Sequence, residues 1–251
     1  MSSAELWNGG QYELVAARFA EVHDALVEAL APQAGERWLD VATGTGEVAL
    51  RAARAGAGAG AEVTGLDIAP RLLEQARSRS SDVDWVEGDA QALPFPDGAF
   101  DVVSSSFGLI FAPDQELAAQ EVARVCRGRL GLTVWRPNDG PHAVYAAFSG
   151  EQPAWPSPDD WGREERLQEL LGDAFELELE ERVWWLEGDS LEDVWELMSN
   201  GAPPVRALLD SLEPDRAAAF RAAMFEHWSQ FETPEGVREP RRYLLVLGER
   251  R

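Results

Sequence analysis

Apolar positions along the first half of the chain predict strands that alternate with helices. The strand-like runs are apolar throughout, which is typical of parallel strands buried on both faces of a sheet. The segments between them place apolar residues at helical spacing. Such alternation implies right-handed βαβ crossovers and an α/β fold. We expect strands over 37–41, 62–66, 83–86, 100–105 and 129–135, and helices over 13–30, 47–55, 70–79 and 113–125.

The pattern changes after about residue 136. Residues 175–185 alternate between apolar and acidic side chains, which indicates a half-exposed strand. Further helices are expected over 162–171, 191–198, 205–212 and 215–231, and a last strand over 242–247. We therefore predict one domain over 1–251. It comprises a lid helix at about 1–32, a core at about 35–136, a strand pair at about 175–185 and 241–248, and an inserted helical cap at about 190–232.

Charge and composition limit the classes of binding partner that we expect. The 251 residues include 45 acids and 22 basic residues, a net charge of −23, and every basic residue is arginine. This balance argues against nucleic acids and anionic membranes, which need cationic side chains. One cysteine and three scattered histidines predict neither a disulfide nor a metal site. Because no segment looks like a signal peptide or a membrane span, we expect a cytoplasmic protein.

A small-residue turn follows the first predicted strand. Residues 38–48, WLDVATGTGEV, run from an apolar strand through Gly44 and Gly46 into a helix. Glycine lets a backbone turn sharply and approach a ligand closely, and nucleotides bind at this end of the first strand in open α/β sheets. With Ala49 the turn also fits a dinucleotide fingerprint, so an NAD-dependent oxidoreductase remains an alternative.

Acidic residues end three successive predicted strands. Asp40 lies four residues before Gly44, Asp67 lies 21 residues after Gly46, and Asp89 follows 22 residues later. Asp40 suits an ammonium group or the water around a zwitterion, Asp67 can accept both ribose hydroxyls, and Asp89 can accept from an adenine amine. Together they describe a ligand with an amino group, a ribose and an adenine, and they make no provision for phosphate.

These features resemble the class I S-adenosylmethionine-dependent methyltransferases. The resemblance is strong over residues 8–136 and looser beyond. It rests on LDVATGTGEVAL (39–50), VTGLDIAP (63–70), VEGDAQALPFPDGAFDVVSSSFGLIFAPD (86–114) and LGLTVWRP (130–137). The third segment is typical of the branch that contains ubiquinone/menaquinone-biosynthesis methyltransferases. The family implies a Rossmann-like, seven-stranded, mostly parallel sheet with an antiparallel last strand.

The resemblance also implies roles for individual residues, position by position. The turn residues would hold the methionine end of S-adenosylmethionine: Asp40, Ala42, Thr43, Gly44 and Gly46. Asp67 would accept from the ribose with Ile68 packed on the adenine, and Asp89 and Ala90 would contact the adenine edge. Ser106 and Phe107, past strand four, would meet the amino group and the methyl face, and Tyr12, before the first helix, would form an aromatic lid.

The chain departs from the family pattern before the fifth strand. Arg127-Gly128-Arg129 replaces a longer glycine-rich turn. We expect a tightened connection there, and the register of the fifth strand is left open.

The implied reaction is in-line SN2 transfer of a methyl group to a small-molecule acceptor at an O, N or C atom, with aromatic or quinone-like acceptors as candidates. Orientation supplies most of the catalysis. A general base helps hydroxyl and carbon acceptors, and His142, expected in the loop after strand five, is the candidate. His23 is expected to be packed in a helix. A non-catalytic cofactor-binding protein is the other alternative, and the sequence allows a homodimer.

Overall fold

The computed structural model describes residues 2–56, 60–137, 140–149 and 157–251 in two compact units. The first, here the helical unit, comprises Met1–Phe19, Asn138–Ala154 and Val183–Arg242. The second, here the sheet unit, comprises Ala20–Pro137, Trp155–Arg182 and Tyr243–Arg251.

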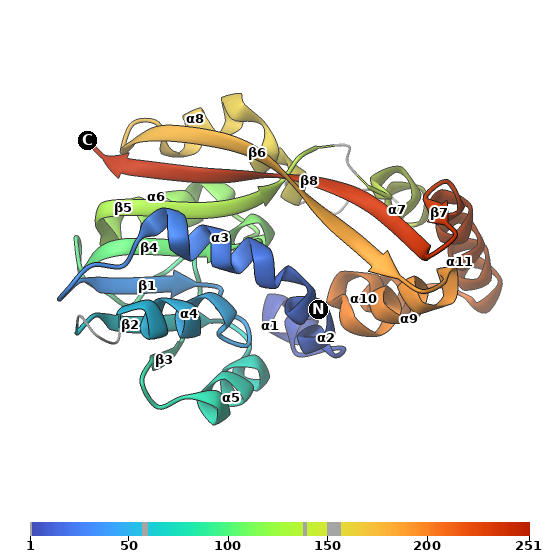
Figure 1. Ribbon diagram of the computed structural model, residues 1–251, viewed down its shortest axis with the longest axis horizontal. Coiled ribbons are helices and arrows are strands. Elements are labelled where there is room, and N and C mark those ends of the chain that lie inside the picture. The colour runs from blue at the N-terminus through green and yellow to red at the C-terminus, as the bar shows by residue number, and fades with distance from the viewer. Residues whose placement is uncertain (1, 57–59, 138–139, 150–156) are drawn as a thin grey trace. The chain divides into compact units, whose positions relative to one another are not determined.

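One sheet organises the sheet unit (Figure 1). Its strands follow the order β3-β2-β1-β4-β5-β8-β6, with β7 paired to β8. Neighbouring strands from β3 to β5 are parallel, and β8 is antiparallel to β5, from Trp135 opposite Tyr243 to Arg129 opposite Glu249. The expected mostly parallel α/β fold with an antiparallel last strand is confirmed. The strands are β1 Arg37–Val41, β2 Glu62–Asp67, β3 Asp84–Glu87, β4 Phe100–Ser106, β5 Cys126–Trp135, β6 Phe175–Gly188, β7 Glu232–Thr233 and β8 Gly236–Arg250.

Helices of the sheet unit bury apolar residues at the expected helical spacing. Leu26 and Leu30 of α3 and Val48 and Leu50 of α4 are all at most 4% exposed. The helices are α3 Ala20–Leu30, α4 Glu47–Gly56, α5 Pro70–Arg79, α6 Gln115–Val125 and α8 Glu164–Leu171, with 3-10 turns at Leu109–Phe111 and Pro158–Gly162.

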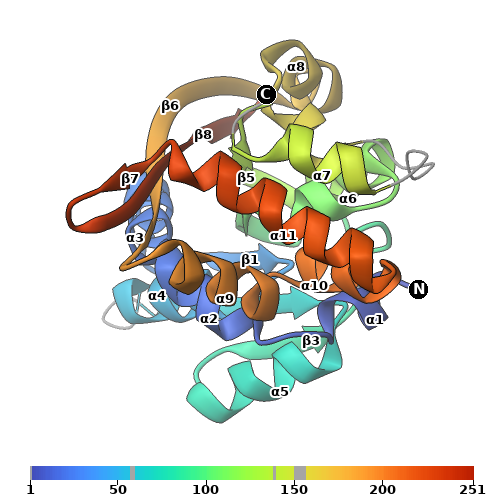
Figure 2. The same ribbon diagram turned by 90° about the vertical axis from the view of Figure 1, so that its right-hand side faces the viewer.

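The helical unit has its own apolar core. Phe220, Met224 and Trp228 of α11 are fully buried and pack with Val194 of α9 and Val205 of α10. Figure 2 shows α7, α9, α10 and α11 gathered together. The helices are α1 Ser3–Trp7, α2 Tyr12–Ala16, α7 His142–Phe148, α9 Leu191–Gly201, α10 Pro203–Ser211 and α11 Pro214–Ser229, with a 3-10 turn at Ala17–Phe19. In the described part of the chain, no helix combines the length and apolar character needed to cross a bilayer.

The predicted helix over 13–30 is wrong in one respect, because it is divided at Ala17–Phe19. The apolar residues that predicted one helix pack in two different cores. The Phe19 ring packs against Trp184 of the helical unit, with 4.5 Å between ring centroids. Val22 and Leu26, further along the stripe, are buried in the sheet unit. His23 is 5% exposed, and burial lowers its pKa to about 4, as a packed histidine requires.

The shortened connection before β5 is absorbed inside the strand. Strand β5 begins at Cys126, directly after α6, and not at residue 129 as predicted. Phe100 pairs with Cys126, whereas Val102 pairs with Arg129, so the pairing contains a bulge. A Cβ atom on Gly128 would lie 2.4 Å from the Asp101 carbonyl oxygen. Glycine is therefore required for the bulge to approach β4.

Candidate cofactor site

Asp40 lies near the carboxyl end of β1 with its carboxylate hydrogen-bonded on both oxygens. Thr43 Oγ1 donates to Oδ2 at 2.5 Å, and Ser104 Oγ donates to Oδ1 at 2.7 Å. The residue is 1% exposed. Burial raises its pKa to about 6, although the bonds from Thr43 and Ser104 favour the ionised form and act in the opposite direction.

Asparagine at position 40 is expected to stabilise the folded protein at pH 8. The pKa of Asp40 is about 6 in the fold against an ordinary value of 3.8, so its ionised form lowers stability above pH 6 and this cost disappears as the pH falls to about 4. About two pKa units correspond to roughly 3 kcal/mol. Urea unfolding of Asp40→Asn should therefore show a gain of up to about 3 kcal/mol at pH 8 and almost none at pH 4.

The matched control is Asp82→Asn, which removes an exposed carboxylate and should change stability little at either pH. A stability difference between Asp40→Asn and the parent that stays the same from pH 4 to pH 8 would contradict the assignment of a buried charge to Asp40.

The turn after β1 is built from unusual backbone conformations. Gly44 and Gly46 have φ of +57° and +85°, and Ala42 has φ of +55° without being glycine. The Thr43 N–H donates to the Leu66 carbonyl at 2.9 Å and ties the turn to β2. A Cβ atom on Gly46 would lie 2.4 Å from Cη2 of Trp85, so the ring fills the space behind the turn.

Asp67 ends β2 and accepts two backbone hydrogen bonds. Its Oδ2 accepts from the Gly44 N–H at 2.7 Å, and its Oδ1 accepts from the Ala69 N–H at 2.9 Å. Burial raises its pKa, and the backbone donors act in the opposite direction. Two oxygens with four lone-pair sites leave acceptor capacity for ribose hydroxyls. Ile68, half-buried, follows it directly.

Asp89 follows β3 and is held by one neighbour. Its carboxylate accepts from the backbone N–H and the side-chain amide of Gln91 at 2.9–3.1 Å. Gln91 Oε1 in turn accepts from the Asp114 N–H at 2.8 Å. Asp89 and Ala90 are both half-buried. The carboxylate is thus oriented, and part of its surface remains accessible.

Beyond β4 the chain reaches Ser106 and Phe107. Ser106 Oγ lies 2.9 Å from Thr133 Oγ1 of β5. Phe107 has φ of +52°, and its ring stacks on Trp135 with 3.9 Å between centroids. A Cβ atom on Gly108 would lie 2.5 Å from the Ala42 Cβ, so the ends of β1 and β4 meet in close contact. Positive φ at non-glycine residues is strained and is found most often at functional sites. Ala42 and Phe107, at the ends of β1 and β4, are two such residues.

The structure brings most of the predicted residues to the carboxyl ends of β1–β4, but two belong to the helical unit. Tyr12 begins α2, with its ring 5.6 Å from that of Trp7. His142 is the first residue of α7 and not a loop residue as expected. The proline before it and the apolar segment after it suit a helix start. The roles of both residues stay predictions.

Sequence reasoning missed Trp38 and Ser104. Trp38 Nε1 donates to Ser104 Oγ at 2.8 Å, and Ser104 is the residue that donates to Asp40. Both were interpreted as interior strand residues. The signal available was the polar run Ser104–Ser106 at the end of an otherwise apolar strand.

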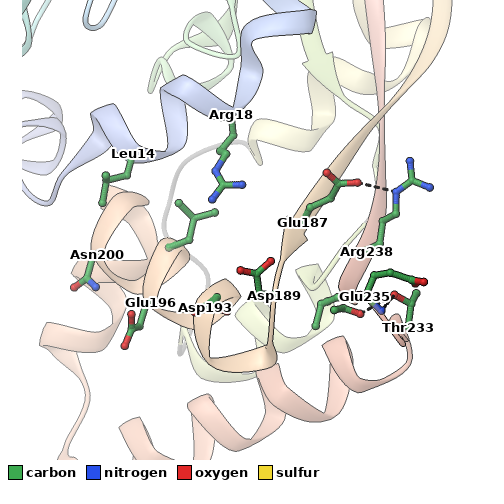
Figure 3. Close-up of a pocket in the computed structure, with 14 residues that line it drawn as sticks. Leu14, Arg18, Glu187, Asp189, Asp193, Glu196, Asn200, Thr233, Glu235 and Arg238 are labelled. Carbon is green, nitrogen blue, oxygen red and sulfur yellow. Dashed lines mark hydrogen bonds and ion pairs between the residues drawn. The ribbon is translucent and has the colours of Figure 1, made fainter.

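A separate hollow of about 890 Å³ lies in the helical unit (Figure 3). Arg238 pairs with Glu187 at 2.7 Å, and Arg18 extends toward the hollow from the N-terminal helices. The nucleoside site is assigned to the sheet unit, because the glycine turn after β1 and the acids at the ends of β1, β2 and β3 lie there. The charged residues that line it are Arg18, Glu187, Asp189, Asp193, Glu196, Glu235 and Arg238. Within the described part of the chain, no group of three or more His, Cys, Asp or Glu residues could hold a metal ion.

A sheet in this order, with a glycine turn after β1 and acids at the ends of β1, β2 and β3, is a Rossmann-like arrangement with a candidate nucleoside site. Residues 39–129 match the family model described as a methyltransferase domain. The chain therefore contains a methyltransferase domain over these residues, and the resemblance drawn from the sequence is confirmed.

The chain is also similar to individual proteins. An uncharacterized protein of Mycobacterium tuberculosis is 37% identical over 179 residues, which are 67% of this chain and 64% of that relative. A ubiquinone/menaquinone biosynthesis C-methyltransferase of Ruegeria is 41% identical over 137 residues, 50% of this chain and 54% of that protein. The chain thus spans less than two thirds of the length of either. The crystal structure of the YcgJ protein from Bacillus subtilis, 18% identical, has the same fold with a TM-score of 0.61, covering 92% of this chain and 98% of its own.

Proposed function

We propose that the protein transfers a methyl group from S-adenosylmethionine to a small-molecule acceptor. The observation that carries the proposal is the set of three carboxylates at the ends of β1, β2 and β3 around the strained turn at Ala42–Gly46. Asp67 and Asp89 take the ribose and the adenine edge, and Asp40 takes the ammonium group or its water. The negatively charged pyrophosphate of NAD would be repelled by the carboxylates here, so the arrangement disfavours NAD.

The acceptor is proposed to be small and to lack phosphate. A net charge of −23 disfavours nucleic acids. The similarity to a quinone-biosynthesis C-methyltransferase makes phenols and quinone-like rings the first compounds to test. His142 is proposed as the general base for such acceptors, and an amine acceptor would not require one.

Calorimetric titration of the full chain with S-adenosylmethionine, S-adenosylhomocysteine and NADH tests the cofactor. Micromolar binding of both sulfur ligands and none of NADH is expected. Release of S-adenosylhomocysteine during incubation with phenols, quinols and amines then tests turnover. Binding without turnover on any acceptor class would favour the non-catalytic alternative, and binding of NADH alone would favour the oxidoreductase.

Replacing Asp89 by alanine is expected to weaken S-adenosylhomocysteine binding about 10-fold. One hydrogen bond to a charged acceptor is lost, worth roughly 1.5 kcal/mol. The same titration with S-inosylhomocysteine, in which a carbonyl oxygen replaces the exocyclic amine, should show no loss of affinity in the variant, because that oxygen cannot donate to Asp89. Equal losses for both ligands would contradict the adenine-edge contact.

A further inference from the structure

A chain of buried hydrogen bonds leads from β1 through β4 to the candidate site. Trp38 Nε1 donates to Ser104 Oγ at 2.8 Å, and Ser104 donates to Asp40 Oδ1 at 2.7 Å. Trp38 is 1% exposed and Ser104 is fully buried. Neither residue was among the predicted cofactor contacts, and both lie behind Asp40 in the sheet.

This chain has a direct electrostatic effect on Asp40. The indole N–H occupies an acceptor site of Ser104 Oγ, and so directs the serine hydroxyl proton to the carboxylate. A donor that is itself hydrogen-bonded polarises and binds more strongly. The ionised form of Asp40 is favoured by Ser104, by Thr43 and by the Ala49 backbone N–H, and it is opposed by burial and by the charge of Asp67. The hydrogen bond from Ser104 therefore favours the ionised form of Asp40 over its protonated form.

We propose that Ser104 and Trp38 are positioning residues that keep Asp40 ionised and oriented, and so set the lowest pH at which the site binds its cofactor. This rests on the proposed function, because it requires the negative charge of the buried Asp40 to act on the ammonium end of S-adenosylmethionine bound at the turn. The cofactor's affinity then follows the charge of Asp40 and falls as the pH is lowered.

The test is calorimetric titration of S-adenosylhomocysteine into the full chain between pH 5 and 7.5. With the pKa of Asp40 at about 6, affinity of the parent protein should fall about 10-fold between pH 7.5 and 5. Ser104→Ala should move the midpoint of this fall upward by about one pH unit, since one charge-assisted hydrogen bond is lost. At pH 7.5 its affinity should stay within about 3-fold of the parent, whereas at pH 6 it should be about 5-fold weaker than the parent.

Two further variants separate positioning from packing. Ser105→Ala removes the next buried hydroxyl of β4, which accepts from the Leu109 N–H at 3.1 Å and does not touch Asp40. It should leave the midpoint where the parent has it. Ser104→Thr keeps a hydroxyl and should restore the midpoint. Any titration of Asp67 is common to all three variants and cancels in the comparison.

The outcomes are distinct. If the parent protein binds no S-adenosylhomocysteine at any pH, the proposed function fails. If the parent binds but Ser104→Ala loses affinity equally at every pH, or if Ser105→Ala moves the midpoint as far, the positioning role is overturned. Trp38→Phe should move the midpoint in the same direction by less than Ser104→Ala, and no movement would restrict the role to Ser104.

Discussion

Replacing Asp67 by alanine is expected to weaken S-adenosylhomocysteine binding by about 100-fold or more. Two ribose hydroxyls would each lose a charged acceptor, and each such bond contributes on the order of 1.5–3 kcal/mol. The variant should also lower stability, because the N–H groups of Gly44 and Ala69 lose the carboxylate that accepts from them. Titration calorimetry measures the first effect and thermal unfolding without ligand measures the second.

Glu87→Ala is the matched control. Glu87 pairs with Asp67 in the β2–β3 register and is exposed. The Glu87→Ala substitution therefore removes a carboxylate at the same level of the sheet. Its affinity and melting temperature should stay close to the parent values. Asp67→Asn keeps the shape of the side chain and removes its charge; the amide oxygen can still accept from one of the two backbone N–H groups, and the amide nitrogen cannot accept from the other. Unchanged affinity in Asp67→Asn would exclude Asp67 from ribose recognition.

Alanine at Gly46 is expected to be among the most destabilising single substitutions, at about 2–5 kcal/mol. Its Cβ would lie 2.4 Å from the Trp85 ring, and overpacking of this kind costs about 1–3 kcal/mol. The φ of +85° adds about 1–2 kcal/mol of backbone strain for a residue with a Cβ. Urea unfolding measures the sum, and cofactor binding should be lost with it because the turn must shift.

Two glycines allow the steric and conformational parts to be separated. A Cβ atom on Gly65 would lie 2.6 Å from Trp85, and its φ is not positive, so Gly65→Ala tests the clash alone. Gly35 has φ of +74° with nothing within 4 Å of an added Cβ, so Gly35→Ala tests strain alone. In a Trp85→Leu background, Gly65→Ala should become nearly neutral, whereas Gly46→Ala should keep about 1–2 kcal/mol. Full recovery of both would show that the turn tolerates alanine.

The part of the site that the sequence could predict is local in the chain. Asp40 and Gly44 stand four residues apart, and Asp67 and Asp89 each follow an apolar run, so the parallel sheet alone brings these acids to one edge. The βαβ core was predictable for the same reason, since each strand is continuous and apolar. The antiparallel last strand came from the resemblance and is confirmed by β8, which pairs with β5.

The remaining features depend on tertiary contacts. Ser104 joins Asp40 across 64 residues and Trp38 joins Ser104 across 66, and no periodicity encodes such a pairing. The division of the first helix at Ala17–Phe19 reflects which core each apolar side chain enters. The five-residue helix α1 depends on the capping box of Ser2 and Glu5, a signal too short to predict a helix by itself.

Strand β8 has a consequence for how the chain reaches its fold. It follows every other strand in the sequence, yet it lies between β5 and β6. During synthesis, residues appear at roughly 5–20 per second and earlier segments begin to fold first. The edge of β5 therefore stays unpaired until β8 has been synthesised. An exposed edge of this kind recruits strands from other chains, and the nascent protein is most prone to aggregate in the interval before β8 inserts.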